Sequence, residues 1–208
     1  LLDPALPPTT TDFTEQVVAM KNAGVQILFL EQEPQNYASA IFRDLAQQDF
    51  HPVVVLGAPS YNPQLVANAG GAGAVDGAYL EQPASLYLGE DASQIPAVTT
   101  FNTWVQKVSP GFTPDFFTLV GWLCGELFVD ALRNAGKDPS RGSLLQALRK
   151  ITAFQSGNLM PVSNPAGKVP VTCYLLGQVS GGRFQRLDDP PVTGPDNGFR
   201  CDGTYYRG

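Results

Sequence analysis

The sequence predicts an α/β fold of two lobes, each with a parallel sheet flanked by helices, and three observations lead to this class. Short apolar runs alternate with helical patterns in the first 90 residues, as in parallel strands joined by helices. About 55 later residues are helical with no strand between them, and such helices need a sheet to cover. Two apolar runs near the end flank paired glycines, which indicates an antiparallel hairpin.

Composition narrows the class of partner. The 208 residues are 43% hydrophobic and 15% charged, enough for a substantial core. The formal net charge of -6 argues against nucleic acid or an anionic membrane as partner, because both would repel the surface. The longest apolar stretch, 116–132, contains glycines and acidic residues and is too broken to span a bilayer. No signal-like run opens the chain, so we expect the true N-terminus to lie upstream of Leu1.

The first predicted elements are a helix and a buried strand. Asp12 to Glu15 has the form of a capping box, and the apolar spacing after it predicts a helix over 12–23. The next run, Val25 to Leu30, contains one polar residue. We therefore expect a strand covered on both faces.

Two further helix and strand pairs follow in the same order. Asn36 can cap a second helix, which leads into a strand from Val53 to Leu56. Asn62 and Pro63 open a third helix, and a strand follows at about Gly77 to Leu80. Three parallel strands are therefore expected.

The middle of the chain is predicted to be three consecutive helices, over 96–108, from Thr113 to about Gly136, and over 140–150. The second is apolar over most of its circumference, so it must be buried on several sides. The three strands upstream already need their own helices. We therefore expect a second sheet to come from residues before Leu1.

The end of the chain is predicted to form a hairpin and a crosslinked tail. Val171 to Val179 and Arg183 to Leu187 read as its two strands. The tail has little apolar surface, and a Cys173–Cys201 disulfide would hold it down in an oxidising compartment. The alternative of two reduced thiols stays open, because spacing does not fix connectivity. Cys124, inside a helical pattern, is expected to be a small buried hydrophobe.

Catalytic motifs do not assemble in this sequence. His51 is the only histidine, which excludes a Ser-His-Asp relay and a multi-histidine metal centre within the chain. The glycines at 71–76 follow a helix and lack the last glycine of a dinucleotide fingerprint. Gly167 and Lys168 lack the earlier glycine of a phosphate loop. We expect no catalytic residue, no metal site and no cofactor.

Candidate ligand residues follow the carboxyl ends of two parallel strands, where open α/β sheets bind ligands. Glu31, Gln32 and Glu33 could oppose a ligand ammonium. Ser60 and Tyr61 could supply a hydroxyl and an aromatic wall. The alternative is that all five are solvated turn residues.

Three segments, 11–25, 121–136 and 182–184, resemble the substrate-binding proteins of ABC importers for branched-chain amino acids, which have the type I periplasmic-binding-protein fold. Thr11 to Val25 is similar to the family segment that leads from a helix into a strand, and Gly121 to Gly136 to its long helix. Gly182 to Phe184 resembles its late hairpin turn. The resemblance covers nearly all of this chain but only about the last three fifths of a typical member. The first lobe is therefore expected to be incomplete here.

The resemblance implies domain boundaries. They are 1–90 for the second-lobe α/β domain, 91–155 for helices that return to the first lobe, and 156–208 for the hairpin and disulfide-tied tail on the second lobe. Trp122 stands where a tyrosine is usual, and the Cys173–Cys201 pair is similar to a lineage of secreted actinobacterial members.

The same resemblance implies the function. It is that of the extracytoplasmic solute-binding component of an ABC importer, periplasmic or lipid-anchored, with a membrane permease as partner. An amino acid or similar polar solute would bind between two hinged lobes, with Glu31 or Glu33 facing its cation and Tyr61 covering its apolar part. Phe117 matches a position that often lines the cleft, although plain core packing remains open for it.

Two other functions remain open at this point. The same clamp could be the sensing domain of a receptor or of an amide-responsive regulator, in which case the gene would add a kinase or a membrane helix. An α/β enzyme with all its catalytic groups upstream of Leu1 is the third possibility.

Overall fold

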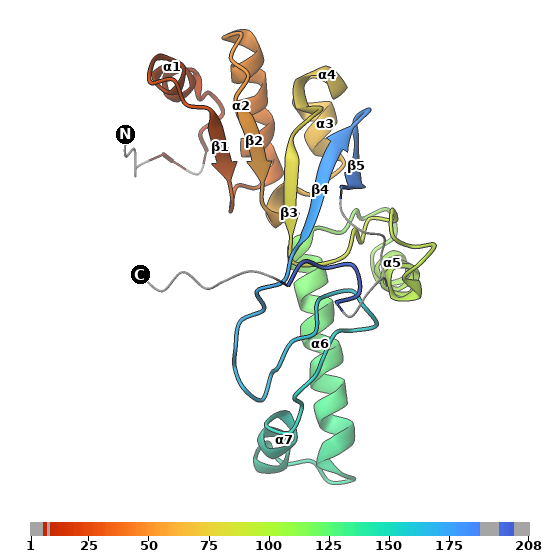
Figure 1. The fold of residues 1–208 in the computed structure, drawn as a ribbon. Coiled ribbons are helices and arrows are strands. Elements are labelled where there is room, and N and C mark those ends of the chain that lie inside the picture. The colour runs from red at the N-terminus through yellow and green to blue at the C-terminus, as the bar shows by residue number, and fades with distance from the viewer. Residues whose placement is uncertain (1–5, 8, 188–195, 202–208) are drawn as a thin grey trace. The chain divides into compact units, whose positions relative to one another are not determined.

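The computed structural model describes residues 6–7, 9–187 and 196–201 (Figure 1). It is a mixed α/β structure, which confirms the predicted class. The chain divides into two compact units. Unit 1 comprises 1–81 and 177–185, and unit 2 comprises 82–176 and 186–208. The chain therefore passes between the units three times, after Glu81, after Leu176 and after Gln185.

Unit 1 is built on a five-stranded sheet with the order β1-β2-β3-β4-β5. Strands β1 and β2 pair in parallel, as do β2 and β3, which confirms the expected parallel strands. Strand β4 runs opposite to β3 in Figure 1, and β5 returns beside it, as the predicted hairpin requires. The strands are β1 (Ile27–Leu30), β2 (Val53–Leu56), β3 (Tyr79–Gln82), β4 (Leu175–Ser180) and β5 (Arg183–Arg186).

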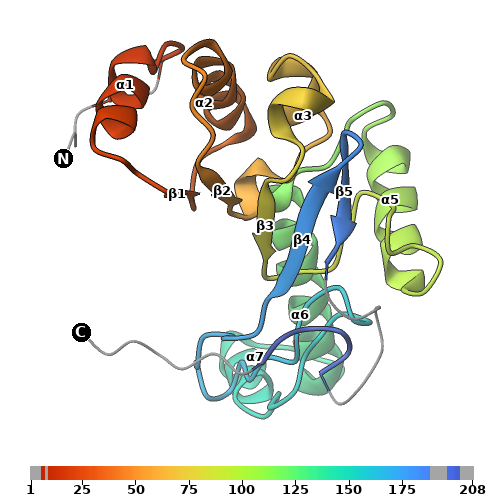
Figure 2. The same ribbon diagram turned by 45° about the horizontal axis from the view of Figure 1, so that its top comes forward.

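The core of unit 1 lies between this sheet and its helices. The register pairs Leu30 with Leu56 and Leu56 with Leu80, and all three side chains are buried. Figure 2 shows helices α1, α2 and α3 side by side along β1 to β3. The helices are α1 (Thr14–Asn22), α2 (Gln35–Gln47), the 3-10 turn η1 (Ala58–Ser60), α3 (Gln64–Asn68) and α4 (Ala72–Val75).

Two predicted helix caps differ in the structure. The Asp12 carboxylate accepts a hydrogen bond from the Thr14 amide at 2.9 Å, and Phe13 takes the N-cap position instead of the predicted capping box. Pro34 precedes α2 in the N-cap position without a side-chain cap, so Asn36 lies inside the helix. Proline favours this place because its fixed φ suits an entry into a helix and it has no amide hydrogen to satisfy.

Strand β1 is not covered on both faces as predicted. Leu30 points into the core, whereas Ile27 is 54% exposed and Phe29 is 65% exposed. Val53, paired with Ile27, is also exposed. Among the described residues, this face of β1 and β2 is an apolar surface without a covering layer.

The hairpin turn is fixed by a carboxylate from another loop. Gly181 and Gly182 both have positive φ, 58° and 71°, which glycine adopts without strain. Both of their amides donate to the Asp76 carboxylate, at 3.0 and 2.9 Å. The predicted glycine turn is therefore confirmed, and Asp76 joins it to the loop before β3.

Unit 2 contains three helices, α5 (Pro96–Val108), α6 (Phe116–Ala135) and α7 (Arg141–Leu148), close to their predicted ranges. Capping boxes begin the last two. The Thr118 amide donates to the Asp115 carboxylate at 2.7 Å, and the Ser143 amide donates to the Ser140 hydroxyl at 3.1 Å.

Helix α6 is largely uncovered. Of its residues only Leu119 and Ala131 are buried, and Phe128 and Val129 are exposed. The described residues of unit 2 therefore leave the apolar surface of α6 without the covering sheet that the sequence predicts. Cys124 is exposed, so the prediction of a buried thiol is wrong, because the layer that would bury it is not among the described residues. No helix in the described part of the chain is long and apolar enough to cross a bilayer.

The predicted disulfide is present between Cys173 and Cys201. Both residues belong to unit 2, whereas the hairpin residues 177–185 belong to unit 1. The predicted grouping of hairpin and tail over 156–208 stays a prediction. Phe199, two residues before the second cysteine, is buried and holds the tail against this unit.

Candidate functional site

The two loops that follow β1 and β2 are joined by a backbone contact within unit 1. The Gly57 amide donates to the Leu30 carbonyl at 3.0 Å. A Cβ atom at position 57 would lie 1.8 Å from the Glu31 carbonyl oxygen. Only glycine allows this approach, so Gly57 fixes the path of the chain at Glu31. Gly57 has no signature in the sequence, because the contact is between loops far apart in sequence.

Ser60 reinforces the same junction. Its hydroxyl is buried and donates to the Glu33 carbonyl at 2.7 Å. Ser60 therefore holds the first loop in place with the hydroxyl that we expected to face a ligand. Glu31 and Gln32 are exposed at this junction and Glu33 is half-buried, so their side chains remain accessible.

Tyr61 lies in the core of unit 1. Its side chain has no exposed surface, and its ring packs edge to face on Phe184 of β5, with centroids 4.9 Å apart. A wall for a ligand would need exposed ring surface. The structure gives Tyr61 a packing role, and we leave it out of the ligand site proposed below.

Glu81 joins the acidic residues at the carboxyl edge of the sheet. Leu30, Leu56 and Leu80 are in register, so the next residue of each strand forms the row Glu31, Gly57, Glu81. The two carboxylates flank a residue without a side chain, on strands about 10 Å apart. Burial raises the pKa of Glu81, and the Glu31 carboxylate raises it further. We call Glu31 and Glu81 the acidic edge. None of the contacts described for these two carboxylates is with a cation.

Glu81 could have been identified from the sequence. It directly follows the predicted third strand, and the rule that selected the loops after the first two strands applies equally to the third. The predicted site included only the loops after the first two strands.

The raised pKa of Glu81 predicts a pH-dependent stability. A carboxyl with a higher pKa in the folded chain holds its proton more tightly there than when unfolded. Its contribution is therefore fully present below the ordinary pKa, 4.5 for glutamate, and is lost as the pH rises through the raised pKa. Glu81→Gln is expected to raise the melting temperature at pH 7, with a difference that disappears near pH 4. Thermal unfolding at both pH values checks this, and an equal difference at the two pH values would contradict it.

Phe117 lies in unit 2, in the first turn of α6. It is 66% exposed, and its ring packs edge to face on Phe116 with centroids 5.9 Å apart. The core packing considered in the sequence analysis is absent among the described residues. Phe117 is therefore free to contact a solute or another polypeptide layer.

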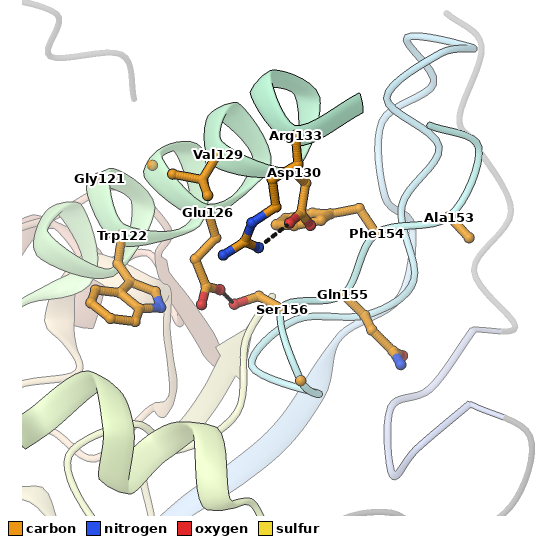
Figure 3. A pocket seen from close by; sticks show the side chains of 12 residues that line it. Gly121, Trp122, Glu126, Val129, Asp130, Arg133, Ala153, Phe154, Gln155 and Ser156 are labelled. Carbon is orange, nitrogen blue, oxygen red and sulfur yellow. Dashed lines mark hydrogen bonds and ion pairs between the residues drawn. The ribbon is translucent and has the colours of Figure 1, made fainter. Parts of the chain in front are cut away.

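A hollow of about 680 Å³ lies along α6 in unit 2 (Figure 3). Two contacts join polar side chains of its lining. The Ser156 hydroxyl donates to the Glu126 carboxylate, and Arg133 pairs with Asp130 at 3.1 Å, as Figure 3 shows. Gly121 and Gly125 form part of its lining, and a Cβ atom at either would meet nothing within 4 Å. This hollow belongs to the uncovered face of α6, and its Glu126 carboxylate is held by a neutral hydroxyl.

Metal ligands do not cluster in the described part of the chain. No group of three His, Cys, Asp or Glu side chains there is placed to hold a metal ion. The acidic edge has two carboxylates, and we treat it as a binding surface for an organic cation.

Comparison with solved structures identifies the architecture. The chain resembles a fatty acid ABC transporter substrate-binding protein from Thermomonospora curvata, with 20% identity and a TM-score of 0.72, over 95% of this chain and 49% of that one. It also resembles a branched-chain amino acid ABC transporter protein from Thermus thermophilus with bound valine, with 18% identity and a TM-score of 0.72, over 88% and 50%. A solute-binding protein from R. palustris in complex with benzoate matches with 18% identity and a TM-score of 0.65, over 88% and 48%.

The chain therefore spans about half the length of these structures, rather less than the sequence resemblance suggested. No curated protein sequence matches it. The family model of the periplasmic binding proteins matches residues 1–183, and this is most of the chain. Family model and fold agree with the predicted resemblance, and the chain belongs to the periplasmic binding protein family with the type I fold.

Proposed function

We propose that this chain is part of the solute-binding component of an ABC importer. Membership of the periplasmic binding protein family supports the proposal, and so does the fold shared with transporter proteins that bind valine or benzoate. Such a component binds its solute without chemical turnover. Its place would be outside the cytoplasm, with a membrane permease as its partner.

The acidic edge carries the proposal for the solute. Glu31 and Glu81 repel one another, and the ammonium group of an amino acid or similar solute between them would offset that repulsion. Glu33 and Gln32 extend the same polar surface. The solute class that fits is therefore a small molecule with a cationic amine, and the junction at Gly57 and Ser60 holds its binding groups in place.

The mechanism we propose is that of a hinged clamp. The three chain passages between the units are its candidate hinge. A solute that contacts both lobes only when they are closed shifts the population toward the closed form. Phe117 stays a proposed solute contact in unit 2, and its exposed ring supports this.

The uncovered apolar faces fit a larger two-lobed protein. Unit 1 exposes Ile27 and Phe29 on β1, and unit 2 exposes Phe128 and Val129 on α6. We propose that residues corresponding to the other half of the matched structures supply the layers over both faces. The helices 91–155 would then belong to the first lobe.

A variant of the acidic edge tests the solute site. In the protein expressed from its complete gene, Glu31→Gln should weaken leucine binding by about 1.5 to 3 kcal/mol, the range for a hydrogen bond to a charged group. Calorimetric titration measures the change. The matched control is Glu15→Gln, an exposed acid on α1, which should leave the affinity unchanged. Equal affinities for the Glu31 variant and the unmodified protein would remove Glu31 from the site.

A further inference from the structure

The last described residues of the chain form a short segment, 197–201, that we call the tail brace. The Cys173–Cys201 disulfide fixes its end. Tyr174 and Arg200 exchange two backbone hydrogen bonds, at 2.9 and 2.8 Å, next to that disulfide. The Asn197 side chain donates to the Gln155 side chain at 3.1 Å. The tail brace is thus held along its whole length within unit 2.

Arg186 connects the tail brace to one passage between the units. It is the first residue of unit 2 after the passage at Gln185, and its side chain is only 8% exposed. One guanidinium nitrogen donates to the Gly198 carbonyl at 2.9 Å. The same guanidinium lies over the Phe199 ring, 5.9 Å from its centroid. The end of β5 is therefore attached directly to the tail brace.

Arg186 reaches the first passage through Asp91, and its neighbour Leu187 contacts the second passage. It forms a two-pronged ion pair with Asp91, with Nε to Oδ1 at 2.9 Å and Nη2 to Oδ2 at 2.8 Å. Asp91 in turn accepts from the amide of Leu86, which follows the first passage closely in sequence, at 2.8 Å. The Leu187 amide donates to the carbonyl of Leu176, the last residue before the second passage, at 3.0 Å.

We propose that Arg186 and the tail brace position the hinge by holding the unit 2 ends of all three passages in one network. The disulfide then affects the hinge as well as the tail brace. Its reduction frees residues 197–201, removes the Gly198 and Phe199 contacts of Arg186, and thereby loosens the chain at Leu86 and Leu187. Arg186 is a positioning residue, because it acts through its contacts with Asp91 and Gly198. The functional consequence, weaker solute binding after reduction, rests on the proposed function.

Amide hydrogen exchange tests the network without a solute. A Cys124→Ser background leaves the Cys173–Cys201 pair as the only cysteines of this chain. Reduction of this protein should speed exchange about tenfold or more at Leu86 and Leu187, as well as at Tyr174 and Arg200. The amides of Leu119 and Leu144, in α6 and α7, are the internal control and should not change. Faster exchange confined to Tyr174 and Arg200 would overturn the proposal.

A variant tests the effect of the Arg186 guanidinium separately from the effect of the disulfide. Arg186→Lys keeps the charge but loses the two-pronged geometry and cannot reach Asp91 and Gly198 together. With the disulfide intact, it should speed exchange at Leu86 and Leu187 and leave Tyr174 protected. Unchanged exchange at Leu86 in this variant would also overturn the proposal.

Leucine titration of the protein expressed from its complete gene supplies the functional readout. We expect the affinity to fall about tenfold on reduction, within the usual range of coupling between two sites. A changed exchange pattern with unchanged leucine affinity would restrict the brace to a structural role and overturn the hinge assignment. If the oxidised protein binds no leucine, the proposed solute fails, and the exchange result still decides the network.

Discussion

Replacing Gly57 by alanine is expected to destabilise unit 1 by about 3 kcal/mol, near the upper end of overpacking effects. The added Cβ would lie 1.8 Å from the Glu31 carbonyl oxygen, and that oxygen belongs to the backbone and cannot rotate away. Gly57 has an ordinary φ of -87°, so the effect comes from contact and not from backbone strain. Urea unfolding followed by circular dichroism measures the loss.

Gly73→Ala is the matched control for this substitution. Gly73 lies in α4 of the same unit, and nothing lies within 4 Å of the Cβ that alanine would add. Alanine should stabilise there by about 0.5 to 1 kcal/mol, because it loses less conformational freedom on folding. Similar stabilities for both variants would show that the two loops do not meet at Gly57.

Replacing Asp91 by alanine is expected to destabilise unit 2 by about 3 to 5 kcal/mol, the cost of removing one partner of a buried ion pair. The side chains of Asp91 and Arg186 are only 4% and 8% exposed. Loss of the carboxylate removes the two-pronged ion pair that holds the buried Arg186 guanidinium, and it removes the acceptor of the Leu86 amide. Chemical unfolding at neutral pH gives the change.

The double substitution Asp91→Leu with Arg186→Met is the control. It removes both charges and keeps most of the side-chain volume, so its loss of stability should be clearly smaller than that of Asp91→Ala. If the double variant is as unstable as the single one, the packing of this region, and not the buried charge, determines its stability.

The local signals of the sequence determine most of the fold. Strands β1 and β2 are apolar runs after helical patterns, and the predicted third run, 77–80, overlaps β3. Periodicity finds such runs without knowledge of their neighbours. The helix at Pro96 and the turn at Gly181 were likewise predicted from residues adjacent in sequence. The Cys173–Cys201 disulfide followed from a composition that could not hold the tail by itself.

The predictions that failed concern burial, which depends on the residues that cover each surface. Phe29 and Cys124 are apolar or small residues in regular elements, and sequence patterns predict burial for both. Their exposure reflects layers that no described residue supplies. Tyr61 as a ligand contact stays a prediction. Its place after a strand suggested a ligand wall, but Phe184, more than a hundred residues later in the chain, covers its ring.

The contacts that position the candidate site and the proposed hinge join residues far apart in sequence. The approach of Gly57 to Glu31 and the pair of Arg186 with Asp91, 95 residues apart, have no signature in sequence. Glu81 could be predicted from its place after a strand. Its interaction with Glu31, however, depends on the register of three strands.

The central claim is that the acidic edge binds the amine of a small solute. Leucine and 4-methylpentanoate, which is leucine without its amino group, differ only in that cation. In a calorimetric titration of the protein expressed from its complete gene, we predict binding of leucine and a loss of affinity of at least about 1.5 kcal/mol for the deaminated acid. Equal binding of both compounds, or binding of the acid alone, would contradict the account.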